Sequence, residues 1–215
     1  GHGGEVDAVA WSPSKPIAVT ASTSSQPGLW ELGLWEIGIS NSEESPGPIK
    51  REKRIPIGEK LKALACDPSD TWIAATSLGD DPLSPKPDVV AFRWDELWNA
   101  EGAPVPIRLG ATKAKHIRFL KRTSEPTLVT GEVGGTVAIY SIGEKDNLIE
   151  RLEPDVFSNQ NHVEALRVVS TEEGDIIVAG ASDGSVTWWN YGTSSEHKRH
   201  DCCGSSVSCV DVSPD

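Results

Sequence analysis

The feature that most constrains the fold of this chain is a short apolar motif that recurs along it. Residues 61–68 (LKALACDP) align with residues 6–13 (VDAVAWSP) position by position, and the last fourteen residues align with the first fourteen without a gap. Looser copies stand at 114–120 (AKHIRFL) and 163–169 (VEALRVV). Internal repetition of this kind is typical of solenoids and propellers, in which each unit buries its apolar face against the next.

The repeats have the spacing of small β-sheets. The central apolar residues of the five copies are 55, 53, 49 and 44 residues apart; they are Val9, Leu64, Ile117, Leu166 and Val210. Two further β-rich runs follow each of the first four copies, most units end in a weaker fourth run, and no window keeps helical periodicity over three turns. The sequence therefore predicts an all-β chain of four four-stranded units and the first strand of a fifth. The approximate bounds of the units are 1–58, 59–110, 111–158, 159–201 and 202–215.

Several residues make these units resemble WD40 repeats. They are the Gly1-His2 pair, the V-x-x-V-x-W-S-P run at 6–13, Trp35-Glu36 where a Trp-Asp pair would stand, and 182–186 (SDGSV) followed by Trp188, Trp189 and Asn190. The resemblance covers essentially the whole chain and implies a β-propeller of radially packed blades. Since a seven-bladed ring at ~45 residues per blade needs more than 300 residues, we expect part of a larger ring of about seven blades.

The chain also departs from the WD40 pattern. In that family a His, a second-strand Ser or Thr, a turn Asp and a third-strand Trp often bond together. Here only the first unit has a His at the right offset, and the fourth keeps the Asp and the Trp. The residues that the resemblance assigns to structural repeat positions are His2, Trp11, Trp35, Asp183 and Trp189. We expect the blades to depend on apolar packing more than on this network.

Charge and cysteine content limit the partners and the compartment. Lys plus Arg number 20 and Asp plus Glu number 32, a net charge of −12, which disfavours direct binding to nucleic acid or to anionic lipid. The apolar runs are too short to insert into a membrane. Four cysteines, two of them adjacent, make a poor disulfide framework, so we expect an intracellular protein of cytoplasm or nucleus.

Three candidate chemical sites were weighed and set aside. Residues 180–184 match the G-x-S-x-G pattern of a hydrolase nucleophile, but a β-rich run follows where a helix is required, so a hairpin turn is favoured. His197, His200, Cys202 and Cys203 could bind a metal, but adjacent cysteines suit a tetrahedral site poorly, and a loop between blades is favoured. The basic run at 50–54 lacks an aromatic platform for nucleic acid. We predict no catalytic residue, metal, cofactor or small-molecule substrate.

Insertions between the strands are the candidate partner-binding segments. Residues 38–53 and 78–88 are polar and rich in proline, which predicts surface loops, and Trp98 lies outside any clear strand. The residues we single out for partner binding are Trp98, Glu43, Glu44, Lys50 and Arg51. Ordinary solvated loops, and packing of Trp98 against a blade edge, are the alternatives.

The functional hypothesis is a non-catalytic scaffold that binds other proteins within a multiprotein complex. A propeller that reads peptides or phosphopeptides is one alternative and would show clustered Arg or Lys at one mouth. A propeller hydrolase with an active site in its channel is another. As a test of the strand assignment, Val9→Asp and Leu166→Asp are each expected to destabilise the chain by burying an unpaired charge.

Overall fold

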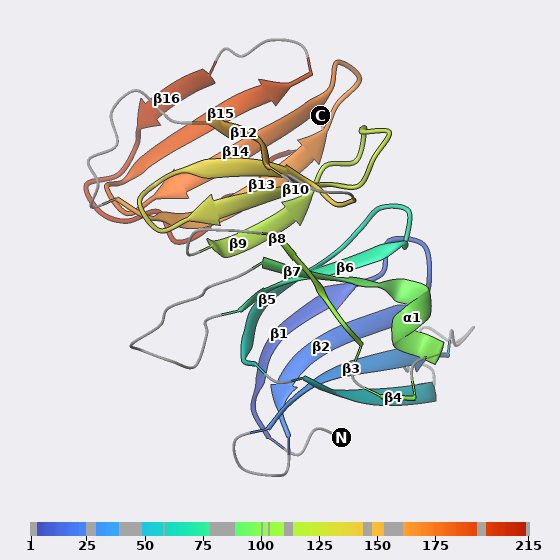
Figure 1. The fold of residues 1–215 in the computed structure, drawn as a ribbon. Helices are drawn as coiled ribbons and strands as arrows, with labels where there is room; N and C mark the ends of the chain where they lie inside the picture. Colours follow the sequence, from blue (N-terminus) through green and yellow to red (C-terminus); the bar gives the residue numbers. More distant parts are fainter. Residues whose placement is uncertain are drawn as a thin grey trace. The chain divides into compact units, whose positions relative to one another are not determined.

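The computed structural model describes residues 4–24, 29–38, 49–57, 59–77, 89–99, 101–102, 104–109, 114–143, 148–152, 161–192 and 197–213. The chain forms two compact units, Gly1–Arg108 and Leu109–Asp215, and each holds two four-stranded antiparallel sheets (Figure 1). In every sheet the strands lie side by side in chain order. The predicted all-β fold of four-stranded blades is therefore confirmed.

The strands of unit 1 are as follows. The first sheet contains β1 (Val6–Trp11), β2 (Ile17–Thr23), β3 (Trp30–Ile37) and β4 (Ile49–Ile57). The second contains β5 (Leu61–Cys66), β6 (Trp72–Ser77), β7 (Val89–Arg93) and β8 (Ile107–Leu109), with helix α1 (Trp94–Asn99) between β7 and β8.

The strands of unit 2 follow the same plan. The third sheet contains β9 (Ala114–Phe119), β10 (Thr127–Glu132), β11 (Val137–Ser141) and β12 (Leu148–Leu152). The fourth contains β13 (Val163–Ser170), β14 (Asp175–Ala181), β15 (Ser185–Tyr191) and β16 (His197–Asp201).

Strand register bears out the alignment of the first four motif copies. Their central residues occupy the same place in the first strand of each sheet and pair with one second-strand position: Val9 with Thr20, Leu64 with Ala75, Ile117 with Thr130, and Leu166 with Ala179. Because a slip of one residue would move every side chain to the opposite face, this agreement fixes which residues face the neighbouring sheet.

Apolar packing between sheets forms the core within each unit. In unit 1, Leu61 and Leu64 of β5 share one buried cluster with Val19 and Leu32 of the first sheet. In unit 2, Leu166 of β13 is buried in a cluster with residues of the third sheet. Full burial of a leucine is worth about 1.5–3 kcal/mol, so the first strand of the second sheet in each unit is a main source of stability.

A buried aromatic side chain stands at one position of the third strand in every sheet. In each sheet, one third-strand residue pairs with the second-strand position named above (Thr20 in the first sheet), and the aromatic residue follows it by two. The four aromatic residues are Trp35, Phe92, Tyr140 and Trp189. Trp35 donates its indole Nε1–H to Thr20 Oγ1 at 2.8 Å. Gly33 is required there, because a Cβ would lie 2.6 Å from both of those atoms.

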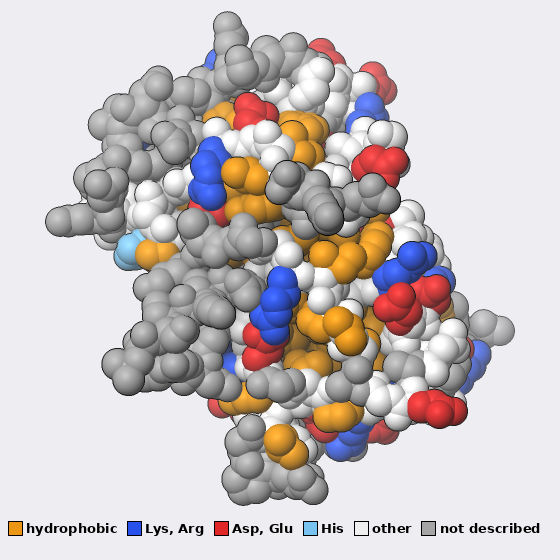
Figure 2. All heavy atoms as spheres, in the orientation of Figure 1, with side chains coloured by type: hydrophobic (Ala, Val, Ile, Leu, Met, Phe, Trp, Pro, Cys, Tyr) orange, Lys and Arg blue, Asp and Glu red, His pale blue; other side chains and the backbone are white. Residues whose placement is uncertain are grey.

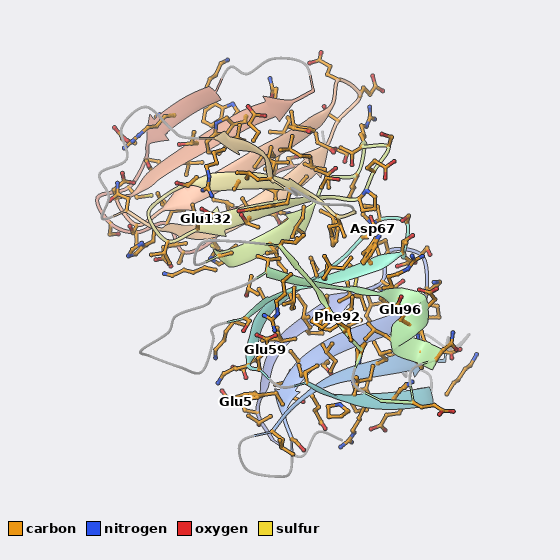
Figure 3. The ribbon with its side chains drawn as sticks, viewed as in Figure 1. Glu5, Glu59, Asp67, Phe92, Glu96 and Glu132 are labelled. Atoms are coloured by element: carbon orange, nitrogen blue, oxygen red, sulfur yellow. The ribbon has the colours of Figure 1, made fainter. Side chains whose placement is uncertain are left out.

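In three sheets the fourth strand has an arginine at the same register position, and this arginine forms an ion pair with an acidic residue. The pairs are Arg54–Glu31 at 3.8 Å, Arg151–Glu132 at 2.9 Å and Arg199–Asp183 at 3.0 Å. Glu132, labelled in Figure 3, is 1% exposed and also accepts from Tyr140 Oη at 3.0 Å. Burial beside this carboxylate raises the pKa of Tyr140 to about 12. The blades thus contain polar networks that sequence comparison with WD40 repeats did not reveal.

The structure corrects three boundaries. Residues 49–53, expected in a surface loop, belong to β4, whose residues pair with β3 from Ile49 to Ile57. The region of His197 to Cys203, expected to be a loop, begins with β16, which pairs with β15. The two missed segments, 49–53 and 197–201, are mostly polar, because an outer strand can pair through backbone hydrogen bonds to a single neighbour without an apolar alternation.

The fifth copy of the motif is the third correction, because its described residues form no strand. A strand needs a partner, and residues 202–213 have no ladder with another strand in the part of the chain that is described. The segment still packs as the alignment predicts. Val207 lies against Gly180 of β14, where a Cβ would come within 2.6 Å of Val207 Cγ1. Val163 approaches Gly131 of β10 in the same way, at 2.5 Å.

Candidate protein-docking site

Helix α1 departs from the repeated plan, since it occupies the connection between the third and fourth strands of the second sheet. Trp94 begins the helix, and its N–H donates to the Thr71 carbonyl at 2.9 Å. Asp95 and Glu96 in the first turn suit the positive end of the helix dipole. Figure 3 labels Glu96 on this helix and Phe92 on the strand before it.

The helix is fastened to the first sheet as well as to the second. Trp94 and Leu97, three residues apart and so on one side of the helix, are buried in the core cluster of unit 1. Lys53 of β4 donates its Nζ to the Trp98 carbonyl at 2.8 Å. Trp98 itself is partly buried against the same cluster. The last turn of α1 is thus held against both sheets of unit 1.

A cavity of about 450 Å³ lies between α1 and the first sheet, at the end where β1 turns into β2. It is lined by Lys15, Pro16, Ile17, Glu36, Trp94, Asp95, Trp98 and Asn99. The volume falls in the range of small-ligand and side-chain pockets, and two tryptophans with a few polar groups form the kind of lining such pockets have. We name this cavity the α1 pocket.

Charged groups surround the aromatic rings of the α1 pocket. Lys15 Nζ lies 5.3 Å from the centre of the Trp94 ring, a cation–π arrangement. Arg93 Nε lies 3.5 Å from Asp95 Oδ1 in an ion pair that is exposed on both sides. Glu36 is half-buried and forms no ion pair with any side chain that the structure describes, among which that of Arg51, its neighbour on β4, is not included. The carboxylates of the pocket therefore outnumber the ammonium group that lines it.

A second candidate surface follows the first strands of the sheets. Each has a β-bulge at the same repeat position, and the extra residue is always charged: Asp7, Lys62, Lys115 and Glu164. A bulge changes the direction in which a side chain points. Here the bulged residues of the two sheets in each unit form ion pairs with one another. Lys62 Nζ lies 2.5 Å from Asp7 Oδ1, and Lys115 Nζ lies 2.7 Å from Glu164 Oε1. The hydrogen bond to Asp7 raises the pKa of Lys62.

The residues predicted to bind partners lie as follows. Trp98 lines the α1 pocket and is also partly buried against the core cluster of unit 1. It therefore both packs against the sheets and faces a cavity. Lys50 is exposed on β4, and Arg51 lies in the same strand but its side chain is not described. Glu43 and Glu44 lie outside the described residues. No pattern along the chain indicates the pocket itself, because its walls come from three separate segments, at residues 15–17, 36 and 94–99.

The predicted structural repeat positions have varied surroundings. Trp11 is 54% exposed on β1, whereas Trp35 and Trp189 are buried. Asp183 accepts from Asn161 Nδ2 at 2.7 Å and from Ser185 Oγ at 2.6 Å. Although partial burial opposes it, hydrogen bonding by Ser185 and the charge of Arg199 lower the pKa of Asp183. His2 lies outside the described residues.

The G-x-S-x-G pattern forms the turn between β14 and β15. Gly184 has φ +88°, and Ser185 N–H donates to Asp183 Oδ1 at 3.0 Å. Ser182 Oγ accepts from the N–H of His162 at 2.9 Å, and β15 begins three residues after this serine. The geometry is that of a strand-to-strand hairpin, not of a strand-to-helix nucleophile elbow.

The described cysteines and histidines near the end of the chain are His200, Cys202, Cys203 and Cys209, and the side chain of His197 is not described. Among the described residues, no three His, Cys, Asp or Glu side chains are placed to hold a metal ion. Cys202 and Cys203 are exposed thiols with their Sγ atoms 3.2 Å apart. Cys66 is different, because burial, helped by Asp70 and Asp67, raises the pKa of its thiol to about 12.

Exposed apolar side chains are interspersed with charged ones on the described surface. Figure 2 shows orange hydrophobic groups between red and blue ones over the part of the view where Figure 1 draws unit 1. The large exposed apolar residues of unit 1 include Val6, Val9, Trp11 and Val105. The described helix has six residues and is too short to cross a membrane.

Comparison with known proteins gives likeness of fold. A scan against protein-family models and a search of curated proteins both find no match. The solved structure of U3-55K matches with a TM-score of 0.65 at 14% identity, over 97% of this chain and 55% of that one. Sqt1 from Saccharomyces cerevisiae matches with a TM-score of 0.57 at 17% identity, over 88% of this chain and 46% of Sqt1. Both are WD40 propeller proteins, and this chain spans about half of their length.

Proposed function

We propose that this chain, which has the fold of WD40-type β-propeller blades, is a non-catalytic scaffold that binds other proteins within a multiprotein complex. The fold alone does not fix the function, because propellers serve many. The observation that carries the proposal is the α1 pocket, in which an inserted helix places Trp94 and Trp98 around a cavity on a rigid pair of sheets. Tryptophans in such pockets are the usual anchors of protein interfaces.

The chemistry of the pocket favours this function over its alternatives. A reader of phosphopeptides needs clustered Arg or Lys, whereas the α1 pocket is lined by one lysine and two carboxylates. A hydrolase needs a nucleophile beside a base, and the serine candidate is the hairpin turn at Ser182. We further predict that the partners are proteins and that the compartment is intracellular. The docking roles of the loop and strand residues also stay predictions; these residues are Glu43, Glu44, Lys50 and Arg51.

The test is affinity purification of the tagged chain, with bound proteins quantified by mass spectrometry. Trp98→Ala is expected to remove at least one class of partner, because truncating a central anchor costs about 2 kcal/mol or more. Asn99→Arg, which changes an exposed residue at the pocket without removing packing, is expected to weaken the same partners.

The matched control is Trp11→Ala, which removes an exposed tryptophan of the same unit outside the pocket. Far-ultraviolet circular dichroism checks that all three variants are folded. Identical partner profiles for the parent chain, Trp98→Ala and Asn99→Arg would overturn the pocket as a docking site.

A further inference from the structure

We propose that the α1 pocket binds a basic side chain, an arginine or lysine, presented by an extended segment of a partner protein. The proposal rests on the proposed scaffold function and names the chemistry of the ligand. Its support comes from the charge balance of the pocket, from the way unit 1 uses its tryptophans, and from the position of one lysine.

The charge balance favours a cation. Glu36 at the end of β3 is half-buried and forms no ion pair with any side chain that the structure describes; the side chain of Arg51, opposite it on β4, is not among these. Asp95 on the other side of the pocket pairs with Arg93 at 3.5 Å, but both side chains of that pair are largely exposed, and such pairs contribute little. A cationic group that enters the pocket beside Asp95 therefore gains a carboxylate and competes there only with an exposed ion pair. The net charge of −12 also attracts basic partners over longer distances.

The tryptophans of unit 1 repeatedly take a cation over the ring. Lys60 Nζ lies 4.6 Å from the Trp30 ring centre, and Arg93 and Arg54 lie at 5.5 Å and 5.8 Å from those of Trp72 and Trp35. Each such contact is worth about 0.5–1 kcal/mol at exposed sites and more when it is desolvated. A cavity lined by two indole rings and a carboxylate can therefore bind a basic side chain through a cation–π contact and an ion pair together.

Lys15 shows how the site accepts an ammonium group. It belongs to the turn between β1 and β2, and its Nζ already lies 5.3 Å from the centre of the Trp94 ring. The backbone of this turn is fixed, because the Ile37 N–H donates to the Pro16 carbonyl at 2.8 Å and the Lys15 N–H donates to Ser12 Oγ at 2.9 Å. The lysine side chain is exposed and long, so it can leave the ring when another cation arrives. Lys15 is thus an internal competitor for the ligand.

Because Lys15 competes with the ligand, substitutions of Glu36 and of Lys15 should change the affinity for a basic ligand in opposite directions. Removing Glu36 takes away attraction, so Glu36→Gln should weaken binding of a basic ligand. Removing Lys15 takes away both repulsion and occupancy of the ring, so Lys15→Gln should strengthen it. An acidic ligand would respond in the opposite sense to both substitutions, and a purely apolar one would respond to neither.

The experiment uses small probes and the full 215-residue chain. N-acetyl-arginine methylamide is titrated while the tryptophan indole N–H signals are followed by NMR, each signal being assigned from a Trp→Phe variant. The matched probes are N-acetyl-citrulline methylamide, which has the same shape without the charge, and N-acetyl-glutamate methylamide.

The arginine probe is expected to shift the Trp94 and Trp98 signals in a saturable way, and the citrulline probe to bind about tenfold more weakly. Glu36→Gln should lower the affinity for arginine about threefold, and Lys15→Gln should raise it about threefold, as expected for partly exposed charge pairs. The Trp11 signal should not move. These results would support the proposal.

Equal binding of arginine and citrulline, tighter binding of glutamate, or unchanged affinity in both charge variants would overturn it. The outcome is separable from the proposed function. If the basic probe fails while Trp98→Ala and Asn99→Arg still remove partners in the purification, the scaffold role stands and only the basic ligand is wrong.

Discussion

Strands β1 and β13 contain the same motif in opposite surroundings. Val9 of β1 is 65% exposed, whereas Leu166, its equivalent in β13, is 3% exposed in the core of unit 2. Leu64 of β5, also equivalent, is 6% exposed. The sheets that bury Leu64 and Leu166 are the preceding ones in their own units, the first and the third. The motif therefore specifies a first strand and its register, while a neighbouring sheet determines whether the apolar side of that strand is buried.

Leu166→Asp should have the largest effect of the changes that test this comparison. It would place an unpaired carboxylate in the buried cluster shared with the third sheet, at a cost of about 3–5 kcal/mol in the free energy of unfolding. Urea denaturation followed by tryptophan fluorescence measures it. A loss below about 1 kcal/mol would mean that β13 is not buried as described.

Gly180→Ala should come next and tests whether the segment containing Val207 packs as a first strand does. The added Cβ would lie 2.6 Å from Val207 Cγ1, and such overpacking costs about 1–3 kcal/mol. Val207→Ala in the same chain should restore only part of the loss, seen as coupling in a double-mutant cycle, because the Val207 Cβ that alanine keeps would still lie 2.9 Å from the added Cβ.

The control for this cycle is Gly143→Ala, where the added Cβ meets nothing within 4 Å. If Gly180→Ala and Gly143→Ala have equal effects, the packing of Val207 on β14 is contradicted.

Trp35→Phe should have a smaller effect. It removes the hydrogen bond from the indole to Thr20 Oγ1 and should lower the free energy of unfolding by about 1 kcal/mol. Combined with Thr20→Ala it recreates the pair found in the second sheet, where Phe92 and Ala75 occupy these positions. The double variant should lose less than the sum of the single variants; strict additivity in thermal or urea melts would show that the hydrogen bond contributes nothing.

Val9→Asp should have the smallest effect, within about 0.5 kcal/mol, because the side chain is already solvated. This differs from the expectation from sequence that Val9→Asp would bury an unpaired charge, because Val9 is 65% exposed. Denaturation of the two aspartate variants side by side measures the difference directly. Equal destabilisation would show that Val9 is covered and would remove the contrast between β1 and β13.

The repeat predicted the strands whose apolar pattern reflects burial on the sheet faces. It placed the first, second and third strands of each sheet and aligned four first strands in correct register. It missed β16 (HKRHD), because an outer strand that is mostly polar has no alternation to detect. It also missed α1, whose six residues are too few for a helical period.

The residues of the candidate site were harder to predict from the sequence than the strands. Trp98 was singled out because it interrupts the strand pattern, but its pocket partners Lys15, Pro16 and Glu36 belong to another sheet. The arginine–carboxylate pairs were also missed, since the acidic partner comes from β3 in one sheet, from β10 in another and from a hairpin turn in a third. Such partners are related by strand register and not by spacing along the chain.

Local patterns along the chain were enough to predict the blade type, the number of four-stranded sheets and the side of each first strand that carries apolar residues. These follow from local alternation and repetition, which any four-stranded antiparallel sheet must satisfy. The solvation of Val9, the burial of Leu166 and the pocket shared by Trp94, Trp98 and Glu36 became visible once the sheets were packed in three dimensions. The reason is that burial and cavities depend on which surfaces meet, and that depends on packing between sheets that the local pattern does not encode.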